Sequence, residues 1–61
     1  MSNTEKLKRR IRGKMVGIKN GTITPKESGL GTLFKLMKDY DEVQYEGLIR
    51  DYKQVLLKLN D

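Results

Sequence analysis

Residues 42–59 read EVQYEGLIRDYKQVLLKL, and this stretch decides the fold class. Successive residues of an α-helix are turned by about 100°, so residues three and four apart share a face. On that spacing, one arc of roughly 120° holds only apolar and aromatic side chains: Tyr45, Leu48, Ile49, Tyr52, Val55, Leu56 and Leu59. The pattern predicts a helix over residues 42–59 with one wide buried face.

The residues around the start of this stretch carry a helix-start signal. Asp41 is a suitable N-cap and Gln44 follows at the third helical position. Tyr40 and Tyr45 hold the two positions of a hydrophobic staple. Gly47 costs about 1 kcal/mol in a helix interior, so we expect another backbone to approach closely there.

A second helix is predicted upstream, over about residues 25–39. Thr24-Pro25-Lys26-Glu27 combines an N-cap, a proline at the first helical position and a glutamate at the third. An apolar arc follows, formed by Leu30, Leu33, Phe34, Leu36, Met37 and Tyr40, while Gly29 and Gly31 weaken the first turns. Because the connection at residues 39–41 is short, the two helices should form an antiparallel hairpin.

The N-terminal segment allows two interpretations. Leu7, Ile11, Met15 and Ile18 recur at helical spacing and predict a helix over residues 4–19, which Asn20-Gly21 would end. Asn20-Gly21 is also the strongest short signal for a type I′ turn, which would give a short β-hairpin around residues 16–24. Gly13 and Gly17 favour the hairpin because they weaken a helix.

Together these patterns predict one all-α domain of three helices spanning residues 1–61, with the basic first helix packed across the hairpin. A chain of 61 residues buries only about 60% of its unfolded surface, so it is marginally stable alone. Val43 and Leu57 fall outside the apolar arc of the last helix. We therefore expect a homodimer or a larger host protein as partner, with an interface formed by Tyr45, Leu48, Tyr52, Val55 and Leu59.

Charge is distributed unevenly along the chain. Residues 1–28 carry eight Lys or Arg and two Glu, a net of 8 − 2 = +6, whereas residues 29–61 carry 5 − 6 = −1. Such a concentration is typical of a surface that meets a polyanion. The candidate contact residues are Lys6, Lys8, Arg9, Arg10, Arg12, Lys14 and Lys19.

The predicted function is that of a small accessory protein that binds nucleic acid through its phosphate backbone. All four aromatic residues lie on predicted apolar arcs, so no stacking platform accompanies the basic segment and duplex is favoured. Gly13 and Gly17, opposite the apolar stripe, would let a phosphate backbone approach. The alternative is an interaction module or inhibitor that grips an acidic protein through helices two and three or the basic helix.

Composition argues against several other classes. The chain has no Cys and no His, which removes disulfides, the usual zinc sites and His-based or thiol catalysis. Only Ser2 and Ser28 offer a serine nucleophile, so we expect no enzyme, cofactor or metal site. No apolar run approaches the roughly 18 to 20 residues of a membrane span, and the first residues carry no apolar leader segment. A cytoplasmic protein without membrane contact is expected.

Overall fold

The computed structural model describes residues 3–59 and is built from helices alone. They are α1 (Asn3–Asn20), α2 (Pro25–Ser28), α3 (Leu30–Tyr40) and α4 (Glu42–Leu59). No strand occurs within the described residues. The predicted all-α fold is confirmed, and the last helix has the predicted bounds.

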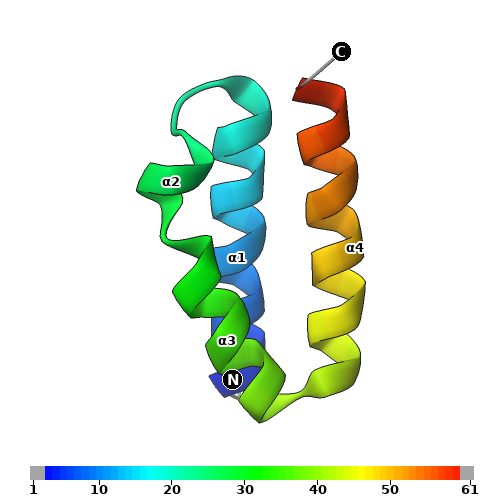
Figure 1. The fold of residues 1–61 in the computed structure, drawn as a ribbon. Helices are drawn as coiled ribbons and strands as arrows, with labels where there is room; N and C mark the ends of the chain where they lie inside the picture. The colour runs from blue at the N-terminus through cyan, green and yellow to red at the C-terminus, as the bar shows by residue number, and fades with distance from the viewer. Residues whose placement is uncertain (1–2, 60–61) are drawn as a thin grey trace.

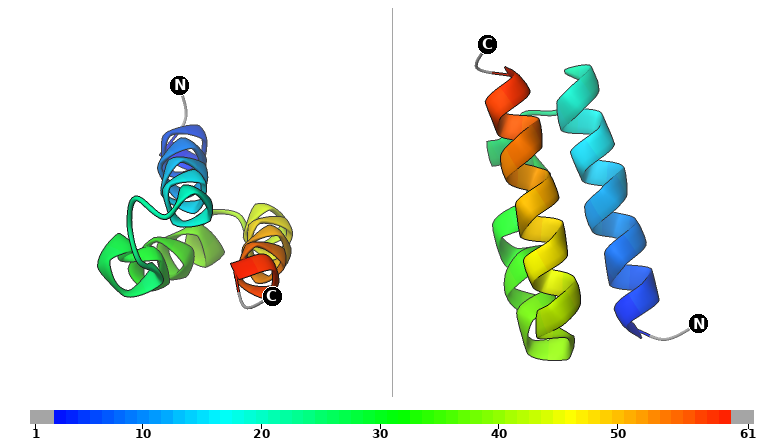
Figure 2. Two further views of the ribbon diagram at one scale, coloured as in Figure 1. Left: turned by 90° about the horizontal axis from the view of Figure 1, so that it is seen from above. Right: turned by 90° about the vertical axis from the view of Figure 1, so that its right-hand side faces the viewer.

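The three long helices run side by side as a small bundle. Figure 1 shows α1 and α4 running in one direction and α3 in the other, with a short connection between α3 and α4. Seen from above, the long helices occupy the corners of a triangle, and each contacts the other two (Figure 2). The single turn α2 lies beside the C-terminal end of α1, where the chain reverses direction before α3.

The core lies between the three long helices and is supplied unequally by them. The predicted stripe of α1 is buried in full, α3 adds three buried residues and α4 adds one; these are Leu7, Ile11, Met15, Ile18, Leu30, Phe34, Met37 and Leu48. The ring of Phe34 lies 6.3 Å from that of Tyr45 and 5.3 Å from that of Tyr52. Aromatic contacts of this kind hold α3 against α4.

The first helix continues to Asn20 and ends in a Schellman motif. Gly21 takes a left-handed conformation with φ 79°. Its N–H donates to the carbonyl of Ile18 at 3.1 Å, and the N–H of Thr22 donates to the carbonyl of Gly17 at 2.9 Å. The β-hairpin interpretation of residues 16–24 is therefore wrong. The left-handed glycine that a type I′ turn needs also satisfies the last carbonyl groups of a helix.

Gly17 has a structural reason for its small size. The Thr22 hydroxyl donates to the Gly17 carbonyl at 3.0 Å, which folds the loop back over the helix. A Cβ atom at Gly17 would lie 3.0 Å from Cγ1 of Ile23 and 3.1 Å from Oγ1 of Thr22. Gly13 has no such neighbour within 4 Å. The expectation that both glycines lie open to a phosphate backbone is wrong for Gly17.

Substituting the two glycines should therefore have different effects on stability. Gly13→Ala should raise the free energy of unfolding by about 1 kcal/mol, because alanine gains helix propensity and meets no neighbour. Gly17→Ala should gain less than this or lose stability, because its Cβ crowds Ile23. Thermal unfolding measures the difference, since about 1 kcal/mol shifts the melting temperature of so small a domain by roughly 4 to 8 °C. Equal gains at the two sites would contradict the packing of the loop on α1.

The predicted second helix is divided in two at Gly29, which corrects the three-helix description. Gly29 takes φ 69° and ψ 19°, a left-handed conformation that ends α2 and precedes α3. Ser28 is buried at the break, and its hydroxyl donates to the Pro25 carbonyl at 2.6 Å. The same oxygen accepts the Leu30 N–H at 3.2 Å. The break redirects the chain so that Leu30 enters the core.

The predicted helix starts are confirmed by hydrogen bonds. The Glu27 N–H donates to Oγ1 of Thr24 at 3.1 Å, and the Thr24 hydroxyl donates to the Glu27 carboxylate at 2.8 Å. At α4, the Gln44 N–H donates to Oδ1 of Asp41 at 3.2 Å. The expected close approach at Gly47 is wrong, because no heavy atom would lie within 4 Å of a Cβ there.

Candidate nucleic-acid interface

Helix α1 carries all seven candidate basic residues. It holds one acidic residue, so its net charge is 7 − 1 = +6. Because the buried stripe takes every third or fourth position, the cations occupy the remaining faces. Lys8 and Lys14 are half-buried, which lets a lysine lay its stem on the bundle and keep its ammonium in water. The other five are exposed: Lys6, Arg9, Arg10, Arg12 and Lys19.

These cations lie on two sides of α1 and not on one flat face. Arg10 and Arg12 are about 160° apart around the helix, with Arg9 between them on the outer face. Lys6 and Arg10 line a groove between α1 and α3, whereas Lys8 and Arg12 line a groove between α1 and α4. The basic surface therefore wraps around the solvent side of the helix.

The groove between α1 and α4 is small and of mixed charge. Its volume is about 200 Å³. Its wall includes the carboxylate of Asp51, which opposes the positive charge of Lys8 and Arg12. A carboxylate weakens anion binding inside a groove, so of the two grooves we take the one on the other side of α1 as the candidate pocket.

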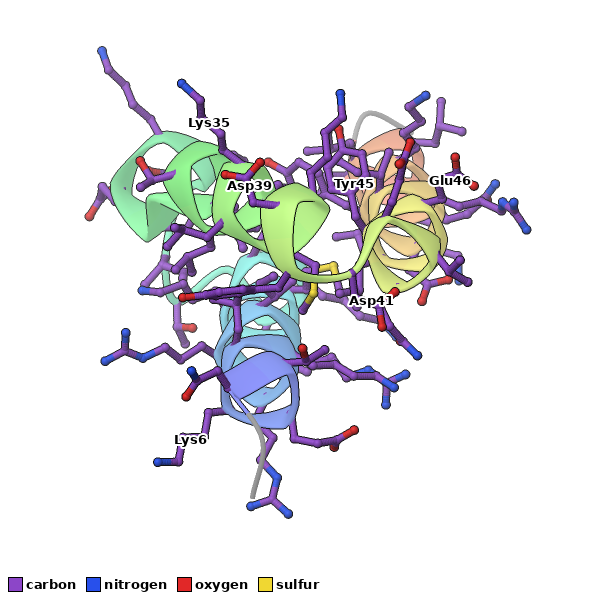
Figure 3. All side chains as sticks on the ribbon, turned by 90° about the horizontal axis from the view of Figure 1, so that it is seen from below. Lys6, Lys35, Asp39, Asp41, Tyr45 and Glu46 are labelled. Atoms are coloured by element: carbon purple, nitrogen blue, oxygen red, sulfur yellow. The ribbon has the colours of Figure 1, made fainter. Side chains whose placement is uncertain are left out.

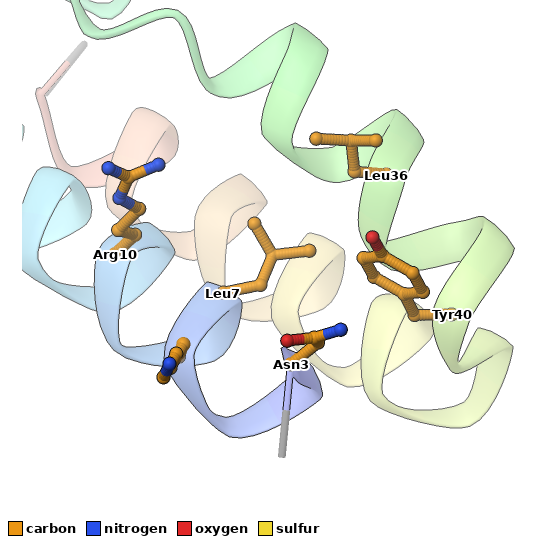
Figure 4. A pocket seen from close by; sticks show the side chains of 6 residues that line it. Asn3, Leu7, Arg10, Leu36 and Tyr40 are labelled. Carbon is orange, nitrogen blue, oxygen red and sulfur yellow. The ribbon is translucent and has the colours of Figure 1, made fainter. Parts of the chain in front are cut away.

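The groove between α1 and α3 is larger and has no acidic residue in its wall. Its volume is about 530 Å³, and its lining residues are Asn3, Lys6, Leu7, Arg10, Leu36 and Tyr40. Figure 4 shows the side chains of Leu36 and Tyr40 reaching from α3 over the groove, with Leu7 between Arg10 and Tyr40. The apolar floor thus has a guanidinium at one end and a phenol at the other.

Two of these residues were missed by the sequence patterns. Leu36 and Tyr40 were expected in the buried arc of the second helix, but they are 42% and 55% exposed. At about 100° per residue, they lie roughly 130° and 90° from the centre of the face that α3 buries. Their position at the edge of the predicted apolar arc could have indicated that they are exposed. A short helix packed against two neighbours buries a face narrower than that arc.

The positive charge of α1 is not matched by direct ion pairs from the other helices in the described part of the chain. Among residues 3–59, no ion pair joins a cation of α1 to an acidic residue of α2, α3 or α4. Figure 3 shows Lys6 pointing away from the bundle, and Asp39 on the far side of α3 from α1. The N-terminal end of a helix adds about half a positive charge, and Asn3 at that end lines the larger groove.

The residues predicted to form an oligomer interface lie mostly in the core of the chain itself. Leu48 is 2% exposed, and Tyr45, Tyr52 and Val55 are half-buried against the core. The Lys38 ammonium also lies 5.9 Å from the centre of the Tyr45 ring. Leu59 remains exposed, as do Val43 and Leu57, which lie on another face of α4.

Comparison with known proteins adds no assignment. No known protein family, curated protein or solved structure matches the chain. Residues 3–59 contain no cluster of three or more His, Cys, Asp or Glu side chains that could hold a metal ion. Over the same residues, no helix combines the length and hydropathy needed to cross a membrane. The basic surface of α1 and the grooves beside it are therefore the candidate site.

Proposed function

We propose that the chain is a small accessory protein that binds nucleic acid through its phosphate backbone, with α1 as the contact element. One observation carries the proposal: a single helix of 18 residues has a net charge of +6, and the other described helices supply no ion pair to it. Lys and Arg that neutralise phosphates release condensed counterions, which drives binding without regard to sequence.

The distribution of charge supports binding more strongly than its total does. A net charge of +5 is ordinary for a small domain that must stay dissolved. Solubility does not require that α1 hold +6 while residues 29–61 hold −1. The preference for duplex rested on all aromatic residues being buried, and the exposure of Tyr40 removes that premise.

The salt dependence of binding tests this proposal. Affinity for a duplex of about 20 base pairs is measured by fluorescence anisotropy between about 50 and 200 mM salt. Four phosphate contacts would give a slope of about −3.6 in log affinity against log salt, so affinity should fall roughly 100-fold over that range. If the protein binds neither duplex nor single-stranded DNA at the lowest salt, the proposal is overturned.

A second candidate is a protein-interaction module, either self-associating or bound to an acidic partner. It is favoured by Val43 and Leu57, which are 79% and 60% exposed on α4. Exposed apolar residues at a bundle surface are typical of an interface, although two separated side chains form a small one. Sedimentation of the protein alone at micromolar concentration tests for self-association, because a dimer has twice the mass of the single chain. Either candidate suits a cytoplasmic protein.

A further inference from the structure

We propose that the groove between α1 and α3 binds an unpaired nucleotide of a single strand, with the base stacked on Tyr40 and the phosphate held by Arg10 and Lys6. This inference rests on the proposed nucleic-acid function and narrows its ligand from polyanions in general to single-stranded nucleic acid. It assigns a base-binding role to an aromatic residue outside the basic segment.

Tyr40 is the aromatic residue with ring surface to offer. Phe34 is buried and contacts both Tyr45 and Tyr52, and these two tyrosines are half-buried against the core between α3 and α4. Tyr40 is 55% exposed, and no residue from 3 to 59 forms a hydrogen bond with its hydroxyl. Stacking of a base on such a ring tolerates any sequence, because every base has an aromatic face.

The order of groups along the groove matches the order of groups in a nucleotide. Tyr40 and Leu36 form one end, Leu7 forms the floor, and Arg10 stands at the other end (Figure 4). A nucleotide likewise presents a flat base, a sugar and then a phosphate. The volume of about 530 Å³ falls within the range of small-molecule sites.

The cations beside the groove continue along the helix. Lys6, Arg10 and Lys14 are spaced four residues apart, so each stands about 6 Å further along the axis of α1 than the one before. A row of this kind can meet successive phosphates of one strand. No acidic side chain lines the groove to oppose them.

The same geometry disfavours the other polyanions. Bases in a duplex are stacked on each other and paired, so they cannot reach Tyr40 without being unstacked. An acidic peptide would use Lys6 and Arg10 but offers no base to the ring of Tyr40. Dependence on Tyr40 that appears with single strands and not with duplex therefore identifies the ligand.

The test compares two substitutions of Tyr40 on two forms of DNA. Affinities for a thymidine oligonucleotide of about 20 residues and for a duplex of equal length are measured by anisotropy at low salt. Tyr40→Ala should weaken single-strand binding about 5- to 100-fold, whereas Tyr40→Phe keeps a ring and should stay within about twofold. Duplex affinity should change less than about twofold in both variants. Tyr40 is half exposed, so circular dichroism should show unchanged helix content.

The charged end of the groove has a matched control on α4. Arg10→Gln should reduce the single-strand salt slope by about 0.7, the value for one phosphate contact. Arg50→Gln removes another exposed arginine, one outside the groove, and should leave the slope unchanged. The ring protons of Tyr40 should also shift in the NMR spectrum when the oligonucleotide is added.

The outcomes separate this inference from the broader proposal. If wild-type protein binds with a steep salt slope but Tyr40→Ala binds single strands equally well, the groove assignment fails and phosphate binding by α1 stands. Equal losses on duplex and single strand would also overturn stacking, as would Tyr40-dependent binding of a polyglutamate peptide. The same measurement is made with a uridine oligonucleotide to represent RNA. A loss of affinity in Tyr40→Ala for either the DNA or the RNA strand supports the assignment. Absence of binding to any nucleic acid overturns both proposals.

Discussion

Replacing Leu48 with alanine should cost about 2 to 5 kcal/mol of unfolding free energy, as large-to-small changes in a core do. Leu48 is 2% exposed and is the single buried residue among those described in α4. Removing its side chain leaves a cavity where α4 meets the other helices. A domain of this length has a total stability of roughly 3 to 9 kcal/mol, so the change removes a large part of it and unfolds the chain if the wild-type stability lies near the low end.

Leu57→Ala is the matched control, because it removes the same atoms from the same helix. Leu57 is 60% exposed, so this change should cost well under about 1 kcal/mol. Chemical denaturation followed by circular dichroism measures both variants. Equal losses at the two positions would mean that α4 presents a different face to the bundle, or that Leu57 is buried by a second chain.

Replacing Arg9, Arg10 and Arg12 together with alanine should nearly abolish duplex binding at low salt. If each arginine neutralises one phosphate, the salt slope falls by about 2.7 and affinity at about 50 mM salt falls roughly 1,000-fold. All three side chains are exposed, and alanine is the strongest helix former, so α1 should remain folded. Anisotropy on two unrelated duplex sequences should show the same loss, because phosphate contacts carry no sequence information.

The control removes an equal charge from a different helix. Arg50, Lys53 and Lys58 are exposed on α4, and their triple alanine variant has the same net charge as the α1 variant. It should retain most of the wild-type slope. If both variants lose affinity equally, total charge governs binding and α1 is not the contact element.

The local sequence patterns predicted the features that are set by residues close together in the chain, namely the buried face of a helix and its N-cap. The spacing of Leu7, Ile11, Met15 and Ile18 was enough to identify the buried face of α1, because helical periodicity is independent of the partner that covers it. The caps at residues 24 and 41 were predictable for the same reason. Each is a contact between residues three apart in the chain.

Features that depend on the docking of distant segments were not predictable in this way. Gly29 is expected to weaken a helix, but its left-handed conformation lies at a break between a buried Ser28 and the core residue Leu30, and this packing is not visible in the local sequence. The groove is a stronger case. Tyr40 lies more than 30 residues from Lys6, and their shared wall exists only because α1 crosses the bundle beside α3. The basic residues could be predicted from the sequence, whereas the aromatic residue beside them required the fold.

Among residues 3–59, the cations of α1 form no ion pair with an acidic residue of α2, α3 or α4, and this has opposite consequences for folding and for binding. Like charges four residues apart, as at Lys6 and Arg10, repel each other along the helix by a few tenths of a kcal/mol per pair. Salt screens this repulsion and so favours the folded chain, while the same salt competes for phosphates. Rising ionic strength therefore acts on the two properties in opposite directions. A bound strand resolves the conflict, because it brings its own negative charge to the helix as a fixed counterion.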